Sequence, residues 1–302
     1  MSSFDTLANT FVIGDIHGCY HTLINLVAQL PQDANLIFVG DLCDKGLYSK
    51  DVIEFVINHN YLCVKGNHEH LYQKYIIDAV KKNIHSPWSS DKRYGGMQCI
   101  KSYKEDNELI TKHLTWIEQL PTYIEIGQYF ITHGFALEFY KHRDDATYYN
   151  DFLLNRYHSD TIEPKINEKI INIFGHCVFE EVQIGEKFFG IDTGCSYGGK
   201  LTAIELTTHT IYQEPMDSRD SNYQMRELRL KDFDVEQKSF EEIQNLSFDK
   251  DSFYSQFDIV SHEVLVAIVT KYRHQGRDEL HRMQKKSLIF PKQLKRVLRE
   301  LL

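Results

Sequence analysis

The sequence predicts a fold of the α/β (α+β) class, in which a parallel part comes first and a more antiparallel part follows. A helical appendage is expected at the C-terminal end. Three observations support this fold class. Five short apolar runs end at a small residue followed by a polar one, helical patterns separate the early runs, and turns separate the later runs. Strands that alternate with helices pair in parallel, with the helices on the sheet faces. We therefore expect a parallel sheet first and a second, more antiparallel sheet after it.

The apolar runs are too short for helices and are predicted to be buried strands. They cover residues 11–13, 36–39, 62–64, 130–131 and 171–174. The first helical pattern between them repeats Leu23, Leu26, Val27 and Leu30 on one face and stops at Pro31. A second helical pattern follows Ser49. Runs at 123–126 and 188–191, next to turns rather than helices, are expected to form the second sheet.

Polar residues of metal-binding type follow the five strands. Asp15 and His17 lie two positions apart, so in an extended chain both point to one side and are expected to hold one cation. Asp41 follows the neighbouring strand, where its carboxylate is expected to bridge two metals. Ligands gather at the carboxyl ends of parallel strands, so we expect these residues to meet there. The ligands expected for the second metal, besides Asp41, are Asn67, His133 and His176.

The donor types indicate which metals the site takes. Carboxylate, amide and imidazole donors together suit Mn, Fe, Zn or Co better than calcium, which prefers oxygen alone. We expect two divalent metal ions, with Mn as the first choice and Fe, Zn, Co, Ni or Mg as the other candidates. Two such ions roughly 3.5–4 Å apart lower the pKa of a shared water and polarise a phosphoryl oxygen. The sequence therefore predicts hydrolysis of a phosphate ester without a covalent enzyme intermediate.

A proton donor is expected beside the metals. His68 follows the expected ligand Asn67 directly and is not needed as a ligand itself. Its imidazole is the expected general acid, which protonates the departing alkoxide. A carboxylate beside an imidazole raises the imidazole pKa and selects the nitrogen that donates. Asp44 is expected to hold His68 in this way.

Composition restricts the partners and the location of the protein. The 302-residue chain carries a formal net charge of −9, which disfavours nucleic acid as a partner. Its apolar runs are shorter than a membrane span requires, and its first ten residues lack the features of a signal peptide. A cytoplasmic location is therefore expected. The six cysteines lack the spacing of a disulfide framework or a zinc knuckle and are expected to be reduced thiols.

The composition of the chain changes after Tyr212. Residues 213–258 are polar and mostly acidic, and helices are predicted at 262–272 and from Pro291 onward. We therefore expect a catalytic domain over residues 1–212 and a polar, then helical extension over residues 213–302. The last helix is basic. It is expected to pack on the catalytic domain, and contact with a partner, a membrane surface or nucleic acid is the alternative.

These motifs resemble those of the calcineurin-like metallophosphatases. Within that family they are similar to the bacterial and phage serine/threonine phosphatases and to the symmetrical dinucleoside tetraphosphatases. The segments GDIHG at 14–18, GDLCDKG at 40–46 and GNHE at 66–69 match the three leading motifs in order and spacing. The resemblance covers residues 10–212 and implies a β-sandwich of two mixed sheets flanked by helices. It also implies that Arg156, together with Lys45 and Asn67, binds the substrate phosphate.

One departure from the family concerns phosphate binding. Lys45 stands where the family usually carries arginine. Lysine keeps the positive charge but lacks the planar group that contacts phosphate at two points. We therefore expect weaker phosphate binding or an altered substrate preference.

The sequence leaves the substrate open. The leading expectation is a phosphoprotein or a phosphorylated small molecule, with phosphoserine or phosphothreonine as the group attacked, because Asp44 and Glu69 are both retained. The enzymatic alternative is diadenosine tetraphosphate or another nucleotide, whose base Tyr94 or Trp88 would stack. The non-enzymatic alternative is a scaffold or binding protein. The complete ligand set and the intact acid argue against this last alternative.

Overall fold

The computed structural model describes residues 7–82, 84, 86–91, 94–157, 169–220, 227–228, 234–239, 242, 259–260 and 262–272. The chain divides into two compact units, Met1–Tyr223 and Gln224–Leu302. The predicted boundary after Tyr212 falls within strand β10 (Ile211–Pro215), and the first unit continues eight residues beyond the end of that strand. All the residues expected to form the site belong to the first unit.

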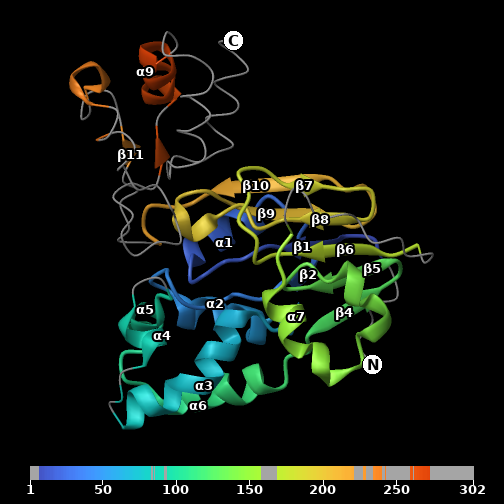
Figure 1. Cartoon of the computed structure of the whole chain (residues 1–302). Coiled ribbons are helices and arrows are strands. Elements are labelled where there is room, and N and C mark those ends of the chain that lie inside the picture. Colours follow the sequence, from blue (N-terminus) through green and yellow to red (C-terminus); the bar gives the residue numbers. More distant parts are fainter. Residues whose placement is uncertain are drawn as a thin grey trace. The chain divides into compact units, whose positions relative to one another are not determined.

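The first sheet has the order β10-β9-β1-β2-β3 (Figure 1). Its other strands are β1 (Thr10–Ile13), β2 (Asn35–Phe38), β3 (Leu62–Cys63) and β9 (Lys200–Glu205). Strands β1, β2 and β3 are parallel, and β9 pairs antiparallel with both β1 and β10. The three predicted early strands therefore lie side by side, as expected.

The second sheet has the order β4-β5-β6-β8-β7. It consists of β4 (Tyr123–Ile126), β5 (Tyr129–Thr132), β6 (Ile171–Phe174), β7 (Gln183–Ile184) and β8 (Phe188–Gly190). Strands β5, β6 and β8 are parallel, and β4 and β7 pair antiparallel at the two edges. Both sheets are mixed, as the family resemblance implied. The prediction of a more antiparallel second sheet was wrong, because a long crossover joins β5 to β6.

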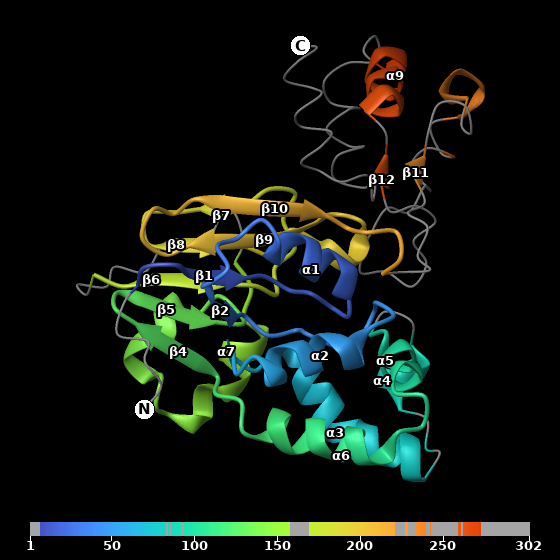
Figure 2. The same cartoon turned by 180° about the vertical axis from the view of Figure 1, so that it is seen from behind.

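Side chains alternate between the two faces of each strand, and this alternation builds the layers of the first unit. In β1, Val12 faces the second sheet and packs in a cluster with Ile131 and Ile173. The neighbouring Phe11 and Ile13 face the opposite way and pack against helices. The two sheets therefore stack face to face, and helices cover their outer faces (Figures 1 and 2).

The helices are divided unequally between the two outer faces. The face of the first sheet packs with α1 (Tyr20–Val27), α2 (Ser49–Asn58), α3 (Asn67–Lys81), α4 (Pro87–Ser90), α5 (Gly96–Ser102) and α6 (Asn107–Glu118). Helices α3 to α6 are additions to the predicted elements. The second sheet packs with the 3-10 helices η1 (Leu137–His142) and η2 (Ala146–Tyr148) and with α7 (Tyr149–Leu154). A further 3-10 helix, η3 (Cys195–Tyr197), precedes β9.

The described part of the second unit is small. It contains β11 (Glu227–Leu228) paired in parallel with β12 (Ile259–Val260), the 3-10 helix η4 (Val235–Gln237) and the helix α9 (His262–Tyr272). Helix α9 matches the helix predicted there. The Lys271 ammonium group donates to the carbonyl oxygens of Val235, Glu236 and Lys238, so it ties α9 to η4. The basic helix predicted from Pro291 lies outside the described residues.

Two properties of the chain bear on its chemistry. All six cysteines lie in the described residues, where they are buried and free. Across the parts of the chain that the structure covers, no helix combines the length and apolar character that a membrane crossing requires.

Candidate metal centre

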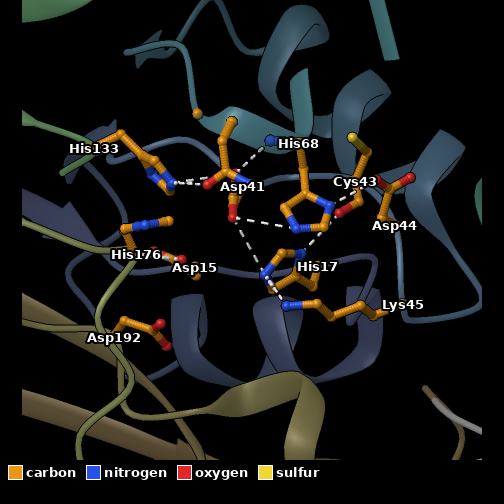
Figure 3. A network of polar contacts seen from close by, with 12 residues as sticks. Asp15, His17, Asp41, Cys43, Asp44, Lys45, His68, His133, His176 and Asp192 are labelled. Carbon is orange, nitrogen blue, oxygen red and sulfur yellow. Dashed lines mark hydrogen bonds and ion pairs between the residues drawn. The ribbon is translucent and has the colours of Figure 1, made fainter. Parts of the chain in front are cut away.

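The six expected ligands come from segments that follow strands of both sheets. Five of them, Asp15, His17, Asp41, His133 and His176, lie close together in Figure 3, and Asn67 contacts His133. Asp15 and His17 follow β1, Asp41 follows β2, and Asn67 begins α3 just after β3. His133 and His176 follow the adjacent parallel strands β5 and β6 of the second sheet. The stacking of the two sheets therefore brings together residues that are up to 161 positions apart in the sequence, such as Asp15 and His176.

The Asp41 carboxylate lies in the middle of the group. Its Oδ1 is 3.3 Å from His133 Nε2, and its Oδ2 is 3.4 Å from His17 Nε2 and 3.9 Å from His68 Nε2. His133 Nε2 is also 2.9 Å from Asn67 Oδ1. One carboxylate thus faces two different sets of donor atoms, which is the geometry expected of a ligand that bridges two metals.

Backbone carbonyls orient two of the imidazoles. The Nδ1 of His17 is 2.9 Å from the carbonyl oxygen of Cys43, and the Nδ1 of His133 is 2.8 Å from that of Val39. A carbonyl oxygen only accepts, so each neutral ring carries its proton on Nδ1. In this neutral form the Nε2 of each ring, which faces Asp41, carries the lone pair that a metal ion would bind.

The backbone is strained where these residues lie. His17, Asp41 and His176 have φ angles of 50°, 50° and 60°, in the left-handed region that residues other than glycine rarely adopt. The neighbouring Asp44 and Lys45 share this conformation, at 73° and 56°. Such strain concentrates at functional sites. The assumption that Asp15 and His17 lie in an extended segment was wrong, because the chain turns at His17.

Two glycines allow the carboxylates to pack against the backbone. A Cβ atom at Gly175 would collide with Asp15 Oδ1, and one at Gly66 would collide with Asp41 Oδ1. The backbone N–H of His176 also donates to Asp15 Oδ2 at 3.0 Å. The peptide chain therefore holds both carboxylates in place before any metal binds.

Glu69 is a buried residue next to the centre that the sequence analysis did not name among the site residues. Its fully buried carboxylate accepts the backbone N–H groups of Asp41 at 2.7 Å, Leu42 at 2.8 Å and Gly66 at 3.0 Å. It therefore joins the loop after β2 to the loop after β3. Its position three residues after Gly66, at the start of a helix, is the sequence signal that indicates this role.

Asp192 is a second residue that the sequence reasoning passed over. It follows β8, is buried, and accepts the backbone N–H of Gly194 at 3.0 Å. Figure 3 places it on the same side of the centre as Asp15 and His176. It ends an apolar run just as Asp15 and Asp41 do, and that pattern would have identified it.

The electrostatics of the centre fit a cation. Burial, followed by the charge of Asp192, raises the pKa of Asp15 well above its ordinary value. Burial also opposes the ionisation of Asp41, but the charges of His133 and His68 hold its pKa well below the usual range. Burial disfavours protonated His133 as well, yet Asp41 raises its pKa to about 10. Three buried carboxylates compete for the few positive charges nearby, and divalent cations would satisfy them.

The Lys45 ammonium group already lies against this set of donors. Its Nζ is 2.9 Å from His17 Nε2 and 4.6 Å from the centre of the Tyr197 ring. Burial opposes its charge, but Tyr197 and Asp41 raise its pKa above the ordinary value. Lys45 therefore keeps its positive charge beside His17.

His68 and Asp44 form a buried pair at the edge of the centre. His68 Nδ1 is 2.6 Å from Asp44 Oδ2, and the indole N–H of Trp88 donates to the same oxygen at 2.7 Å. Burial raises the pKa of Asp44, and the hydrogen bond with His68 opposes this shift. Trp88 is completely buried, so the suggestion that it stacks a nucleotide base was wrong.

The remaining residue expected at the phosphate is Arg156. It follows α7 and is exposed. Burial and the charge of His133 lower the pKa of His176 to about 2, and the charge of Arg156 contributes to the same shift. Arg156 therefore lies within electrostatic range of His176, on the side of the second sheet.

The chain is similar to several known proteins. Residues 8–237 match the family described as calcineurin-like phosphoesterase. The asymmetrical bis(5'-nucleosyl)-tetraphosphatase PrpE of Halalkalibacterium halodurans is 28% identical over 65% of this chain and 89% of its own length. Serine/threonine-protein phosphatase 2 of Salmonella typhimurium is 27% identical over 67% of this chain and 94% of its own length. One similar solved structure is described as the crystal structure of a putative diadenosine tetraphosphatase and is 22% identical in sequence. It superposes on 69% of this chain and 94% of its own with a TM-score of 0.52, which shows a shared fold.

Proposed function

We propose that this chain, which belongs to the calcineurin-like phosphoesterase family, hydrolyses phosphomonoesters, with phosphoserine and phosphothreonine of proteins as its leading substrates. Members of the family are phosphoester hydrolases with a dinuclear metal centre. The observation that carries the narrower proposal is the buried hydrogen bond of 2.6 Å between His68 and Asp44. It provides a proton donor beside the donor atoms grouped around Asp41.

In this proposal two sets of side chains hold the metals. Asp15, His17 and Asp41 would hold one ion, and Asp41, Asn67, His133 and His176 would hold the second. When bound, the ions would lower the pKa of a water molecule and polarise the phosphoryl oxygens. We propose Mn as the metal, since the donors mix oxygen with imidazole nitrogen.

His68 supplies the proton that the leaving group needs. Its Nδ1–H donates to Asp44, so Nε2, which faces Asp41, carries the proton that is transferred. The alkoxide released from phosphoserine or phosphothreonine is strongly basic and depends on this proton. A nucleotide leaving group departs through a phosphate oxygen, which is far less basic. A general acid that is held in place, as His68 is by Asp44, therefore favours an alkyl phosphate as the substrate.

Lys45 and Arg156 are proposed to bind the phosphate itself. Lys45 lies beside His17, and Arg156 lies within electrostatic range of His176. The two cations would contact the non-reacting phosphoryl oxygens, together with the amide of Asn67. This arrangement positions the phosphate and lowers the energy of the charge that develops during transfer.

Dinucleoside tetraphosphate hydrolysis is the second candidate. It is favoured by the names of the relatives, which include asymmetrical rather than symmetrical tetraphosphatases. Of the two aromatic residues expected to stack a base, Trp88 is completely buried and Tyr94 is half-buried, so Tyr94 is the candidate that remains. The metals and the proposed ligands would be the same for both substrates.

One experiment separates the two candidates. The protein is stripped of metal, refilled with Mn, and assayed on p-nitrophenyl phosphate, a phosphoserine peptide and diadenosine tetraphosphate. We expect the phosphopeptide to have a higher kcat/KM than diadenosine tetraphosphate, and Asp41→Asn to abolish activity on all three. A higher kcat/KM for diadenosine tetraphosphate would refute the leading proposal. In that case AMP with ATP as products would indicate asymmetrical cleavage.

A further inference from the structure

We propose that Cys43, Asp44 and Cys99 form an additional metal site, which binds a thiophilic divalent cation of the zinc class. The site lies next to the proposed two-metal centre but shares no ligand with it. Its existence does not depend on which phosphate ester the protein cleaves.

The geometry of the three side chains suits one ion. A carboxylate oxygen of Asp44 and the sulfur atoms of Cys43 and Cys99 all lie within 4.8 Å of one another. Zinc binds sulfur at about 2.3 Å and carboxylate oxygen at roughly 2.0–2.2 Å, so tetrahedral ligands lie roughly 3.5–3.8 Å apart. The three donor atoms therefore lie near the spacing that one bound ion requires.

Asp44 has one oxygen available for this ion. Its Oδ2 already contacts His68 and Trp88. Its Oδ1 is buried and has no hydrogen-bond partner within the part of the chain that the structure describes. A buried carboxylate oxygen without a partner is costly, because it has lost its contacts with water and gained none. A cation bound between this oxygen and the two thiols would remove that cost.

A fourth oxygen lies in the same cluster. The Ser49 side chain is fully buried, accepts the backbone N–H of Asp44 at 3.0 Å and is hydrogen-bonded to the Cys99 thiol. We assign its hydroxyl as the fourth donor of the proposed site. Cys99 is contributed by α5 and the other residues by the segment from 43 to 49, so a bound ion would cross-link α5 to the loop that carries Lys45.

The donor chemistry selects the metal. Thiolates prefer zinc and softer ions such as cadmium, whereas carboxylate and imidazole donors accept Mn and Mg. The two neighbouring sites are therefore expected to take different metals from a mixture. Binding converts both thiols to thiolates and releases their two protons to the solvent.

Occupancy of the site has a consequence for His68, and this consequence alone rests on the proposed function. A cation on Asp44 Oδ1 withdraws negative charge from Oδ2, which accepts the Nδ1–H of His68. The imidazole then holds its charged form less well. We expect zinc to lower kcat on the phosphoserine peptide more than on p-nitrophenyl phosphate.

Spectroscopy tests the site without any substrate. The full chain, reduced and saturated with Mn, is titrated with cadmium while the near-ultraviolet thiolate-to-metal charge-transfer band is followed. The ligands of the proposed two-metal centre contain no sulfur, so cadmium bound there contributes no such band. We expect a band that saturates at one equivalent, disappears in Cys43→Ser and Cys99→Ser, and persists in Cys19→Ser, since Cys19 is also buried but lies outside the cluster.

Two results would overturn the proposal. One is the absence of the charge-transfer band in the unaltered protein, and the other is a band that survives in both Cys43→Ser and Cys99→Ser. If the two serine variants fail to fold, as judged by circular dichroism, Asp44→Asn decides the question because it keeps both thiols. We expect Asp44→Asn to bind cadmium at least about tenfold more weakly, and an unchanged affinity would refute the site. None of these readouts depends on catalysis, so they remain interpretable if the proposed function fails.

Discussion

His68→Asn is the sharpest test of the proposed proton donor. The substitution removes an imidazole whose Nδ1 lies 2.6 Å from Asp44 and whose Nε2 faces Asp41 at 3.9 Å. Asparagine retains a short polar side chain at the start of α3 but cannot donate a proton to a leaving alkoxide. The residues proposed to hold the metals are unchanged, so the variant is expected to keep its metal.

The expected loss depends on the leaving group. General acid catalysis contributes about 10²–10⁴-fold to a rate, equivalent to about 3–5 kcal/mol of transition-state stabilisation. The buried and doubly hydrogen-bonded Asp44 orients the imidazole well, so we expect a loss within this range on a phosphoserine peptide. The nitrophenolate of p-nitrophenyl phosphate leaves with little help, and for this substrate the loss should stay below about tenfold.

The assay compares kcat/KM for the two substrates in Mn-loaded protein, with metal content measured on the same samples. His70→Asn is the matched control, because His70 lies in the same helix and contacts Tyr149 rather than the centre. It should keep activity within about twofold. Full activity of His68→Asn on the peptide, or equal losses on both substrates, would refute the general-acid role. Loss of metal from the variant would instead make His68 a ligand.

Four further predictions follow from the structure. Gly175→Ala places a Cβ atom against the Asp15 carboxylate and should weaken Mn binding at least about tenfold in calorimetric titration; an unchanged Kd would contradict the packing argument. Asp220→Ala removes the carboxylate that accepts the N–H groups of His21 and Thr22 at the start of α1. Urea denaturation should therefore show a free energy of unfolding that is lower by roughly 1–3 kcal/mol. A smaller change would mean that water replaces this cap. Lys45→Arg should lower the inhibition constant of inorganic phosphate, since a planar group contacts two oxygens; a raised constant would show that the site is shaped for lysine. The pKa of Asp15 is raised in the metal-free protein, and its proton must leave before Mn binds. The affinity for Mn should therefore be highest above that pKa and should fall as the pH drops through it. An affinity that does not vary with pH would count against Asp15 as a ligand.

Much of this protein was predictable from short stretches of sequence. Apolar runs that stop at a small and then a polar residue located β1, β2 and β6 to within a residue or so and placed Asp15, Asp41 and His176 at their ends. Helix α9 was predicted with the same bounds that the structure shows. These features follow from local rules, namely the periodicity of burial and the residue types that end a strand.

Other features depend on contacts between segments that are distant in the sequence, and local sequence patterns do not predict those contacts. The parallel pairing of β5 with β6 requires a crossover of 38 residues, from His133 to Ile170, which the turn-based prediction overlooked. Asp220 caps a helix 198 positions earlier, and Trp88 reaches Asp44 from a separate helix. Sequence alone therefore determined the five strands that precede the expected site residues and the chemistry available at their ends, whereas it did not predict β7, β9 or β10. Tertiary packing decided which groups became buried neighbours, because burial and hydrogen bonding are set by contacts between distant segments.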